Sequence, residues 1–311
     1  MFKGHRVAVV IPAYNEGAFI KQVLQSLPDY VDYIIVVDDC SQDDTFAQAS
    51  TCGDSRVMML RTPSNLGLGG ATLTGYRHAL ELGSDVIVKM DGDGQMPPEY
   101  MADLLNVLIE EGYDYAKGNR FLVGESLAAM PKHRLFGNIV LTLMAKLASG
   151  YWHIFDSENG YTAIKASALR ALDFHAMHKR YFFAEDMLIQ LNVHNFRVKD
   201  VPIPARYGEE ESGINPFQVA VTFPFLFFKR FIWRVYQKYI LRNFSPIALF
   251  LITGTLLFVW GVGFGAYLWI RSALTDHPTP TGTVMLAVVP LILGFQLLLQ
   301  ALVLDIQETP K

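Results

Sequence analysis

The sequence predicts an α/β fold: a mostly parallel, Rossmann-like sheet with helices on both faces, followed by a basic interfacial helix and two transmembrane helices. Residues 1 to about 205 alternate short apolar runs with helical stretches, which is the pattern of a parallel sheet covered on both faces. A cation-rich segment follows at 216–244. Beyond it, residues 246–270 and 284–304 include no charged side chain, as expected of membrane spans.

Each predicted strand ends in polar residues. The apolar runs that predict strands are 7–11, 33–37, 56–60, 86–90 and 113–117, and helices are expected near 16–27, 43–52, 68–82 and 98–111. Polar segments follow the strands at 12–16, 38–41, 91–95 and 118–120. Because ligands bind at the carboxyl ends of the strands in an open α/β sheet, these polar groups are expected to gather along one edge.

The segment Asp91-Gly92-Asp93-Gly94-Gln95 directly follows the fourth predicted strand. Its two glycines permit a tight turn in which both carboxylates converge on one hard divalent cation. Mg²⁺ or Mn²⁺ held there would be shared with a diphosphate. The alternative for these five residues alone is a solvated Asp-Gly turn.

Composition narrows the functional classes. The chain has 311 residues, is 51% hydrophobic and has a net charge of -4, so it has room for one sizeable domain and an apolar part. Basic residues do not interleave with aromatic residues before Phe217, so nucleic acid is not an expected partner. Cys40 and Cys52 are the only cysteines, and no histidine pair has metal-ligand spacing. The first apolar run, 7–11, is too short for a signal peptide.

A dinucleotide-binding oxidoreductase is the obvious rival for such a fold. It would place glycines in the turn after the first strand, but that turn has none before Gly17. The glycine-rich segment 65–70 follows the third strand instead, and Thr72 stands where a third glycine would be needed. The segment is interpreted as the tight start of a helix beside a nucleotide, or as purely structural.

The two uncharged segments are long enough to cross a membrane. The 25 residues of 246–270 reach about 37 Å as a helix and the 21 residues of 284–304 about 31 Å. The link from Arg271 to Thr283 has room only for a hairpin loop. A buried helical hairpin of a soluble domain is the alternative. Because cations concentrate before the first span, we expect an integral membrane protein whose catalytic domain lies on the cytoplasmic face.

A basic helix is expected to lie against the lipid bilayer. Arg230, Arg234, Lys238 and Arg242 recur every four residues, so on a helix they form one stripe among aromatic side chains. A plain amphipathic core helix is the alternative. The expected domains are 1–215 (catalytic), 216–244 (juxtamembrane) and 245–311 (transmembrane hairpin).

Polar and small residues within the spans indicate helix packing. Gly261 and Gly265 have small-xxx-small spacing, and Gln296 and Gln300 share a helix face. These pairs predict packing within the hairpin or between subunits of a homo-oligomer; incidental placement is the alternative.

The assembled motifs resemble glycosyltransferase family 2, and within it the polyprenyl-phosphate glycosyltransferases such as dolichyl-phosphate mannose synthase and undecaprenyl-phosphate glucosyltransferase. The resemblance covers almost the whole chain. Its motifs are VxIPAYNE at 9–16, VVDDxS at 36–41, NxGxGxA at 65–71, MDGDGQ at 90–95, GNR at 118–120 and DSENGY at 156–161.

The resemblance implies a GT-A fold and a donor site. Pro12, Tyr14 and Glu16 would line the nucleotide pocket, and Asp39 would receive the base; a helix cap is the alternative for Asp39. Asp91, Asp93 and Gln95 would hold the metal on the donor's diphosphate. The metal would neutralise charge that builds on the leaving nucleoside diphosphate.

The chemistry of the acceptor decides which residues count as catalytic. A phosphate monoester is mostly ionised at neutral pH, so a lipid phosphate acceptor needs cations more than it needs a base. The candidate cations are Arg120, Arg134, Arg206 and His133, with Lys132 behind them.

Two carboxylates are candidates for orienting the acceptor or acting as a base. Asp156 matches a family aspartate near the acceptor, and Asp186 opens a helix with Glu185; favourable charge at that helix N-terminus is the alternative. In 208–213 the chain has Gly213 where relatives often have lysine, so a phosphate contact there would fall to Ser212 and Arg206.

These expectations combine into a metal-dependent, inverting transfer of one sugar from a UDP- or GDP-linked donor to a polyprenyl phosphate. A processive polysaccharide synthase of the same fold is one alternative, although the QxxRW motif that it would need is not found. A catalytically silent sugar-nucleotide-binding membrane protein is the other.

Overall fold

The computed structural model describes residues 1–122, 132–157, 159–204 and 216–310, and for 132–138 and 216–220 it describes the backbone alone. Backbone contacts divide the chain into two compact units. The first is Met1–Phe231 with Pro310–Lys311, and the second is Ile232–Thr309.

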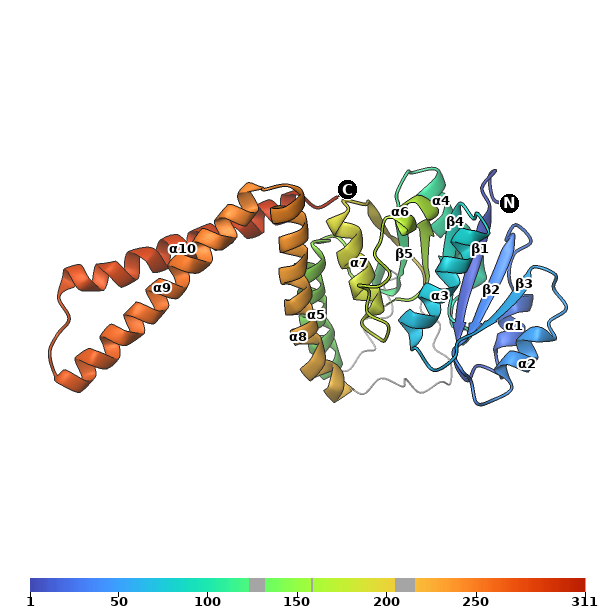
Figure 1. Ribbon diagram of the computed structural model, residues 1–311, viewed down its shortest axis with the longest axis horizontal. Coiled ribbons are helices and arrows are strands. Elements are labelled where there is room, and N and C mark those ends of the chain that lie inside the picture. The colour runs from blue at the N-terminus through green and yellow to red at the C-terminus, as the bar shows by residue number, and fades with distance from the viewer. Residues whose placement is uncertain (123–131, 158, 205–215, 311) are drawn as a thin grey trace. The chain divides into compact units, whose positions relative to one another are not determined.

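The first unit is built on a seven-stranded sheet with the order β3-β2-β1-β4-β6-β5-β7 (Figure 1). The strands are β1 Val7–Ala13, β2 Tyr33–Asp38, β3 Val57–Arg61, β4 Val86–Lys89, β5 Tyr115–Asn119, β6 Thr162–Lys165 and β7 Val198–Pro202. β6 runs antiparallel to both of its neighbours, β4 and β5, while the other four pairings are parallel. The predicted mostly parallel α/β sheet is confirmed.

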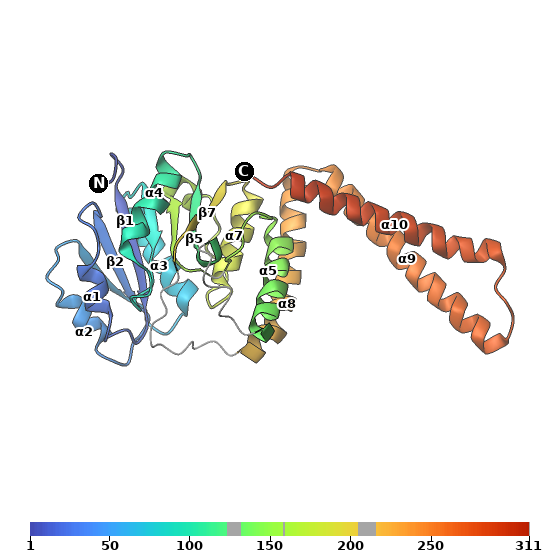
Figure 2. The same cartoon turned by 180° about the vertical axis from the view of Figure 1, so that it is seen from behind.

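Helices cover both faces of this sheet, as predicted. They are α1 Ile20–Gln25, α2 Thr45–Ser50, α3 Leu68–Glu81, α4 Met101–Ile109, α5 Lys132–Ser149, α6 Ala166–Arg170 and α7 Phe183–Val193, with short 3₁₀ turns η1 Pro98–Tyr100 and η2 Arg120–Leu122. Figure 2 shows α1 and α4 over one face, and Figure 1 shows α3, α6 and α7 over the other.

β1 explains why both faces need cover. Val7, Val9 and Ile11 join the core under α1 and α4, whereas Ala8 and Val10 join the core under α3, α6 and α7. All five are fully buried, because successive side chains of a strand point to opposite faces. A continuous apolar run is therefore the correct signature of this central strand.

Several elements differ from the sequence prediction. The fifth strand begins at Tyr115 rather than at residue 113, because Asp114 lies in the preceding turn and accepts a hydrogen bond from the Arg197 amide at 2.9 Å. β6 and β7 are not predicted by hydrophobic pattern, since β6 has only two apolar residues, Ala163 and Ile164, and Lys199 and Asp200 interrupt β7. Long-range pairing, rather than local pattern, makes these segments strands.

Three of the four cations in the basic stripe expected at the membrane interface, Arg230, Arg234 and Lys238, do not face outward, which corrects that expectation for them, whereas Arg242 is exposed. α8 spans Pro216–Val235 and continues into a π-helical turn, η3 Tyr236–Arg242. Arg230 pairs with Asp186, and Arg234 is fully buried against Asp305. The carboxylates that these arginines meet are distant in sequence, so the helical spacing alone could not reveal them.

The outward surface of α8 is apolar instead. Val221, Phe225, Phe228 and Ile232 are all exposed and follow the i, i+4, i+7, i+11 spacing of one helix face. On its other side, Phe223 and Phe227 pack edge-on against Phe182, with ring centroids 5.4 and 5.0 Å away. An exposed face of this size is typical of a surface that meets lipid or another apolar partner.

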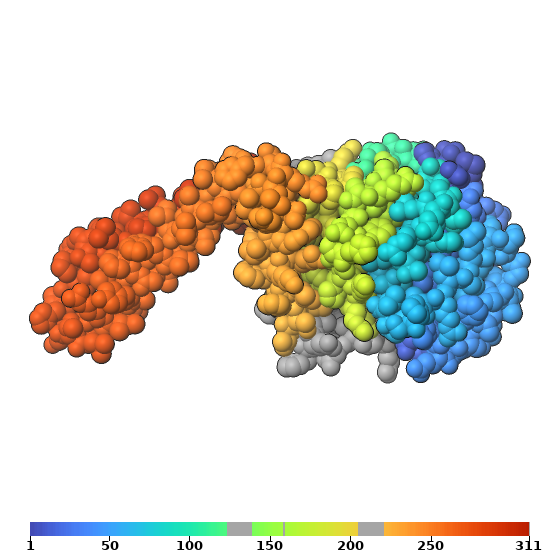
Figure 3. Space-filling view, in the orientation of Figure 1, coloured from blue at the N-terminus to red at the C-terminus, as the bar shows by residue number. Residues whose placement is uncertain are grey.

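The second unit contains two long apolar helices, α9 Pro246–Thr275 and α10 Thr281–Gln307, coloured orange to red in Figure 3. Both are long and apolar enough to cross a membrane. Only 22% and 17% of their most apolar windows are buried, so they are unlike the core helices of a soluble domain. The helices extend beyond the predicted spans, and Arg271 lies within α9 rather than in the loop.

Glycines bring α9 and α10 into close contact. A Cβ added to Gly294 would lie 2.5 Å from the Phe258 nitrogen, and one on Gly261 would lie 2.7 Å from Leu291. A Cβ added to Gly254 would lie 3.1 Å from the Gly294 carbonyl oxygen, which is also a close contact. Small residues therefore serve packing within the hairpin, one of the two roles expected for them.

Candidate functional site

A polar cavity of about 140 Å³ lies at the carboxyl ends of β4 and β5. It is lined by side chains of the turn after β4, by Arg120 after β5 and by the segment that precedes β6. Four predicted site residues are thus brought together: Asp91, Asp93, Gln95 and Arg120. The gathering of polar groups at one sheet edge is confirmed for these strands.

The turn after β4 presents two carboxylates to this cavity. Asp93 Oδ1 accepts a hydrogen bond from the Gln95 amide at 2.9 Å, which fixes the turn. No cluster of three Asp, Glu, His or Cys side chains that could hold a metal occurs among the described residues. Two carboxylates with one amide oxygen nevertheless suit Mg²⁺ or Mn²⁺, which usually completes its coordination with water and substrate phosphates.

Lys89 is a site residue that the sequence analysis missed. It is 3% exposed at the end of β4, and its ammonium group pairs with Asp91 Oδ1. A Cβ added to Gly160 would lie 2.4 Å from Lys89 Nζ and 2.7 Å from Asp91 Oδ2. An alanine there would therefore displace the Lys89 ammonium group or the Asp91 carboxylate. A lysine inside an apolar strand just before the carboxylates was the available signal.

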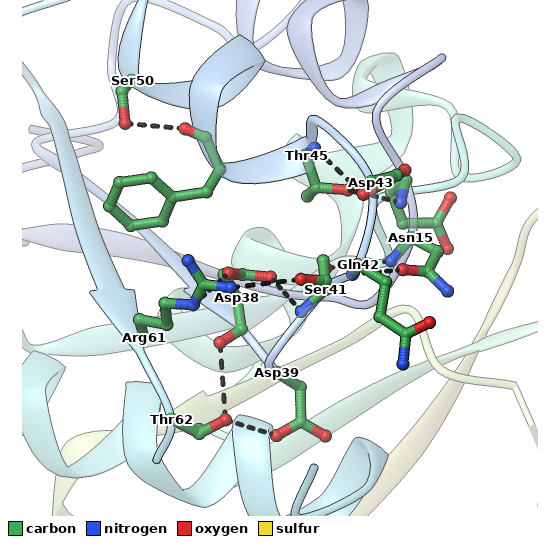
Figure 4. Close-up of polar contacts among 12 residues, drawn as sticks. Asn15, Asp38, Asp39, Ser41, Gln42, Asp43, Thr45, Ser50, Arg61 and Thr62 are labelled. Atoms are coloured by element: carbon green, nitrogen blue, oxygen red, sulfur yellow. Dashed lines mark hydrogen bonds and ion pairs between the residues drawn. The ribbon is translucent and has the colours of Figure 1, made fainter. Parts of the chain in front are cut away.

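The loops after β1 and β2, which carry predicted nucleotide-site residues, are tied together (Figure 4). The Asn15 amide donates to Ser41 Oγ at 3.0 Å, and the Glu16 amide donates to Thr45 Oγ1 at 2.8 Å. Asn15 and Cys40 have φ of 59° and 65°, a conformation that non-glycine residues adopt mostly at turns and functional sites.

Glu16 links these loops to the carboxylate turn after β4. A Cβ added to Gly92 would lie 3.3 Å from Glu16 Cγ, so the two segments are in contact. Of the other predicted nucleotide-pocket residues, Pro12 is buried in β1 and Tyr14 is exposed. The structure therefore places Glu16 beside the turn that carries Asp91 and Asp93.

Asp39 is held by the glycine-rich segment. Its carboxylate accepts hydrogen bonds from the Leu66 amide at 2.9 Å, the Gly67 amide at 2.7 Å and Thr62 Oγ1 at 2.7 Å. It does not cap the next helix, since the residue preceding α2 is Asp44. The glycine-rich segment begins α3 with Gly67 at φ 80°, a conformation that favours glycine.

Arg120 and Asp156 form a two-point ion pair beside the cavity. Arg120 Nε lies 2.8 Å from Asp156 Oδ2, and Nη2 lies 2.9 Å from Oδ1. Burial would raise the pKa of Asp156, but hydrogen bonds from Arg120 and the charges of Lys117 and Arg120 outweigh it and lower that pKa. Asp156 is therefore a carboxylate that orients Arg120 and is poorly suited to accept a proton.

A buried polar cluster of Lys117, Asn119, Asp200 and the Asn159 carbonyl group supports this ion pair. Lys117, at 1% exposure in β5, donates to the Asn159 carbonyl oxygen at 2.7 Å. Burial lowers the pKa of Lys117 to about 8. Asp200 accepts hydrogen bonds from Asn119 and from the Phe155 amide, and burial raises its pKa. These hydrogen bonds hold Phe155 and Asn159, which are the chain neighbours of Asp156 and Gly160.

Asp186 serves α8 rather than the cavity. It lies in the first turn of α7, as expected, and is fully buried. Its carboxylate pairs with Arg230 and accepts the His178 amide at 2.7 Å. Burial raises the pKa of Asp186 in spite of the Arg230 charge.

Five further candidates cannot be placed in the cavity. Lys132, His133 and Arg134 lie at the start of α5, where the structure describes only the backbone. Arg206 and Ser212 lie outside the described residues.

Comparison with known proteins identifies the family of this fold and site. The model of glycosyl transferase family 2 matches residues 8–173. A UDP-N-acetylglucosamine–dolichyl-phosphate N-acetylglucosaminyltransferase of Methanococcus voltae is 32% identical over 218 residues, 65% of this chain and 86% of the relative. An undecaprenyl-phosphate mannosyltransferase of Micrococcus luteus is 34% identical over 213 residues, 67% of this chain and 86% of the relative.

Solved structures show the same fold. Glucosyl-3-phosphoglycerate synthase from Mycobacterium tuberculosis, crystallised with Mn²⁺, UDP and glucosyl-3-phosphoglycerate, superposes with a TM-score of 0.56 at 21% identity. The match covers 74% of this chain and 80% of that one. The family model spans more than half of the chain and covers the strands that carry the cavity, so this protein belongs to glycosyltransferase family 2.

Proposed function

We propose that this glycosyltransferase is metal-dependent and inverting, and that it transfers one sugar from a nucleotide-sugar to a polyprenyl phosphate at the membrane. The observation that carries the proposal is one cavity with the paired carboxylates of Asp91 and Asp93 on one side and Arg120 on the other. Such a site accommodates a cation-bound diphosphate donor together with an anionic acceptor.

On the donor side, Asp91, Asp93 and Gln95 would hold Mg²⁺ or Mn²⁺. When bound, the metal supplies positive charge to the leaving nucleoside diphosphate. Lys89 holds Asp91 in place, while Glu16 borders the same turn. One relative is named for a UDP-linked donor, and structural neighbours were crystallised with UDP and with Mn²⁺ or Mg²⁺.

On the acceptor side, the site supplies charge rather than a base. A phosphate monoester is already ionised near neutral pH and can attack the anomeric carbon directly, which inverts its configuration. Asp156 fixes the orientation of the Arg120 side chain, which can present its guanidinium to phosphate oxygens. Dolichyl-phosphate and undecaprenyl-phosphate are the acceptors named in the relatives, and a lipid acceptor fits a chain with an apolar hairpin.

The hairpin would anchor the enzyme where such a lipid lies. We assign residues 1–215 to catalysis, 216–244 to the juxtamembrane segment and 245–311 to the membrane hairpin. The exposed apolar face of α8 would enter the interface. The exposed cations Lys229 and Arg242 precede α9, which favours a cytoplasmic catalytic domain.

The substitution Asp93→Ala tests the proposal. Purified full-length enzyme in liposomes with undecaprenyl or dolichyl phosphate would receive radiolabelled UDP- or GDP-sugars, and lipid product would be resolved by thin-layer chromatography. Loss of at least about a thousandfold in rate is expected, because charge stabilisation of the leaving group is removed. Asp29→Ala, an exposed carboxylate, is the matched control.

Three results would contradict the proposal. Near-normal transfer by Asp93→Ala would exclude the metal assignment. A long polymer instead of a singly glycosylated lipid would identify a processive synthase, and nucleotide binding in calorimetry without any turnover would identify a silent binder.

A further inference from the structure

α10 carries glutamines on the side opposite to its contact with α9. Ala287, Gly294 and Ala301 recur every seven residues and are buried against the hairpin partner. Gln296 and Gln300 are exposed. At 3.6 residues per turn they lie roughly 160° and roughly 120° around the helix from Gly294. α9 therefore cannot reach their carboxamides while Gly294 packs against it.

The same face continues in both directions as an exposed strip. Gln307 falls within about 20° of the two glutamines around the helix axis, and Val303 and Val289 lie close to the same line. All three are exposed. We call the strip of Gln296, Gln300 and Gln307 the glutamine face.

The position along the helix makes this polarity costly. Gln296 is separated from Thr281 by about 22 Å of helix and from Gln307 by about 17 Å, so it lies near the middle of a membrane span. Within the described residues, the side-chain carboxamides of Gln296 and Gln300 have no hydrogen-bond partner. A carboxamide facing hydrocarbon loses water on all its donors and acceptors, and acyl chains replace none of them.

A second copy of the same face supplies what is missing. A carboxamide both donates and accepts, so two glutamines satisfy one another, and a two-fold axis brings the same residues together from both helices. The spacing of four residues places two such pairs on one line. An unrelated partner would need its own polar strip at the same depth, whereas a second copy carries one by necessity.

We propose that the glutamine face of α10 is an interface through which two copies of this chain associate within the membrane. This inference rests on the proposed membrane span but not on catalysis. It assigns a partner to a face that the hairpin leaves uncovered.

The test uses full-length protein reconstituted into liposomes at decreasing protein-to-lipid ratios, with dimers counted by single-molecule photobleaching. The double substitution Gln296→Leu/Gln300→Leu is expected to weaken association roughly tenfold or more, since each interhelical hydrogen bond contributes a modest increment in membranes. Gln296→Asn/Gln300→Asn, which retains the carboxamides, should associate more tightly than the leucine variant. Phe295→Ala, roughly 100° from Gln296 around the helix and exposed, is the control and should leave association unchanged.

A disulfide experiment locates the contact independently. Val303→Cys, beside the glutamines, is expected to cross-link two chains on mild oxidation, and Phe295→Cys, roughly 80° from it around the helix, is not. The parental chain, with Cys40 and Cys52, gives the background.

Unchanged association of the leucine variant, or a monomer at every density, would overturn the inference. Release of the parental chain from membranes by alkaline carbonate would show that the hairpin does not span the membrane, and it would thereby also overturn the inference. Sugar transfer by the leucine variant is measured in parallel, so failure of the interface and failure of the proposed function give different results.

Discussion

Arg120 donates two side-chain hydrogen bonds to Asp156, from Nε to Oδ2 at 2.8 Å and from Nη2 to Oδ1 at 2.9 Å. The Arg120 backbone amide also donates to Asp156 Oδ2 at 3.1 Å. The arginine follows β5 and the aspartate precedes β6, so the pair joins two segments at the cavity. This geometry makes the carboxylate the orienting group and leaves the guanidinium as the candidate acceptor ligand.

We expect Asp156→Asn and Arg120→Lys each to lower kcat/KM by roughly a hundredfold, because a cation displaced by about 1 Å no longer meets the acceptor phosphate. The double variant should be little worse than either single variant, since both changes break one unit. Steady-state kinetics with varied lipid phosphate would measure this. Fully additive losses would show that Asp156 acts on its own.

We expect Asp39→Asn to lower the free energy of unfolding by about 1–3 kcal/mol, because the amide side chain cannot accept from both the Leu66 and Gly67 amides. Nucleotide affinity should fall with it. Thermal or urea unfolding in detergent measures the first effect and calorimetry with UDP and GDP the second. Asp29→Asn, an exposed carboxylate, is the control. Unchanged stability with lost affinity would assign Asp39 to the ligand alone.

We expect Gly160→Ala to reduce transfer at least about tenfold while the protein stays folded. The new Cβ would lie 2.4 Å from Lys89 Nζ and 2.7 Å from Asp91 Oδ2, so the lysine or the carboxylate has to move. Mn²⁺ titration followed by electron paramagnetic resonance, together with transfer assays, would measure the effect. Gly263→Ala is the control, since its Cβ would meet nothing within 4 Å. Full activity in Gly160→Ala would show that this closure is not needed.

We expect Lys117→Met to flatten the pH dependence of stability between about pH 8 and the unfolded lysine pKa near 10.4. Burial lowers the pKa of Lys117 to about 8, so in this window the unfolded chain binds the extra proton and wild-type stability rises with pH. Below pH 8 both states are protonated and the slope ends. Lys238, whose pKa burial also lowers to about 8, contributes equally to wild type and variant and cancels in the comparison.

Melting temperatures measured from pH 7 to 10.5 in detergent would test this expectation. A variant with the same slope as wild type would show that Lys117 does not titrate in the folded protein in that window.

Local patterns were sufficient for the frame of the molecule. The apolar runs of β1, β2 and β4 are buried on both sheet faces, so their continuous hydrophobicity predicted them as strands. The carboxylate turn after β4 was recognisable because its chemistry is contiguous in sequence. The two apolar helices were likewise visible from length and absence of charge.

Partners distant in sequence were beyond such patterns. The four-residue spacing of Arg230 and Arg234 correctly placed them along one helix, yet said nothing of Asp186 and Asp305, which turn them inward. Lys89 and Lys117 interrupt apolar strands, and only the structure shows their partners, Asp91 and the Asn159 carbonyl oxygen. An ion pair or a buried hydrogen bond depends on where two segments meet, not on either segment alone.

By itself, the sequence determined the α/β layering, the carboxylate turn, the resemblance to its family and the membrane-length helices, because each follows from neighbouring residues and a regular period. Only the tertiary structure decided that Asp156 belongs to Arg120, that Asp186 anchors α8, and that Gln296 and Gln300 face away from α9. The physical reason is that charge and hydrogen bonding act between groups brought together by folding, whereas periodicity acts along the chain.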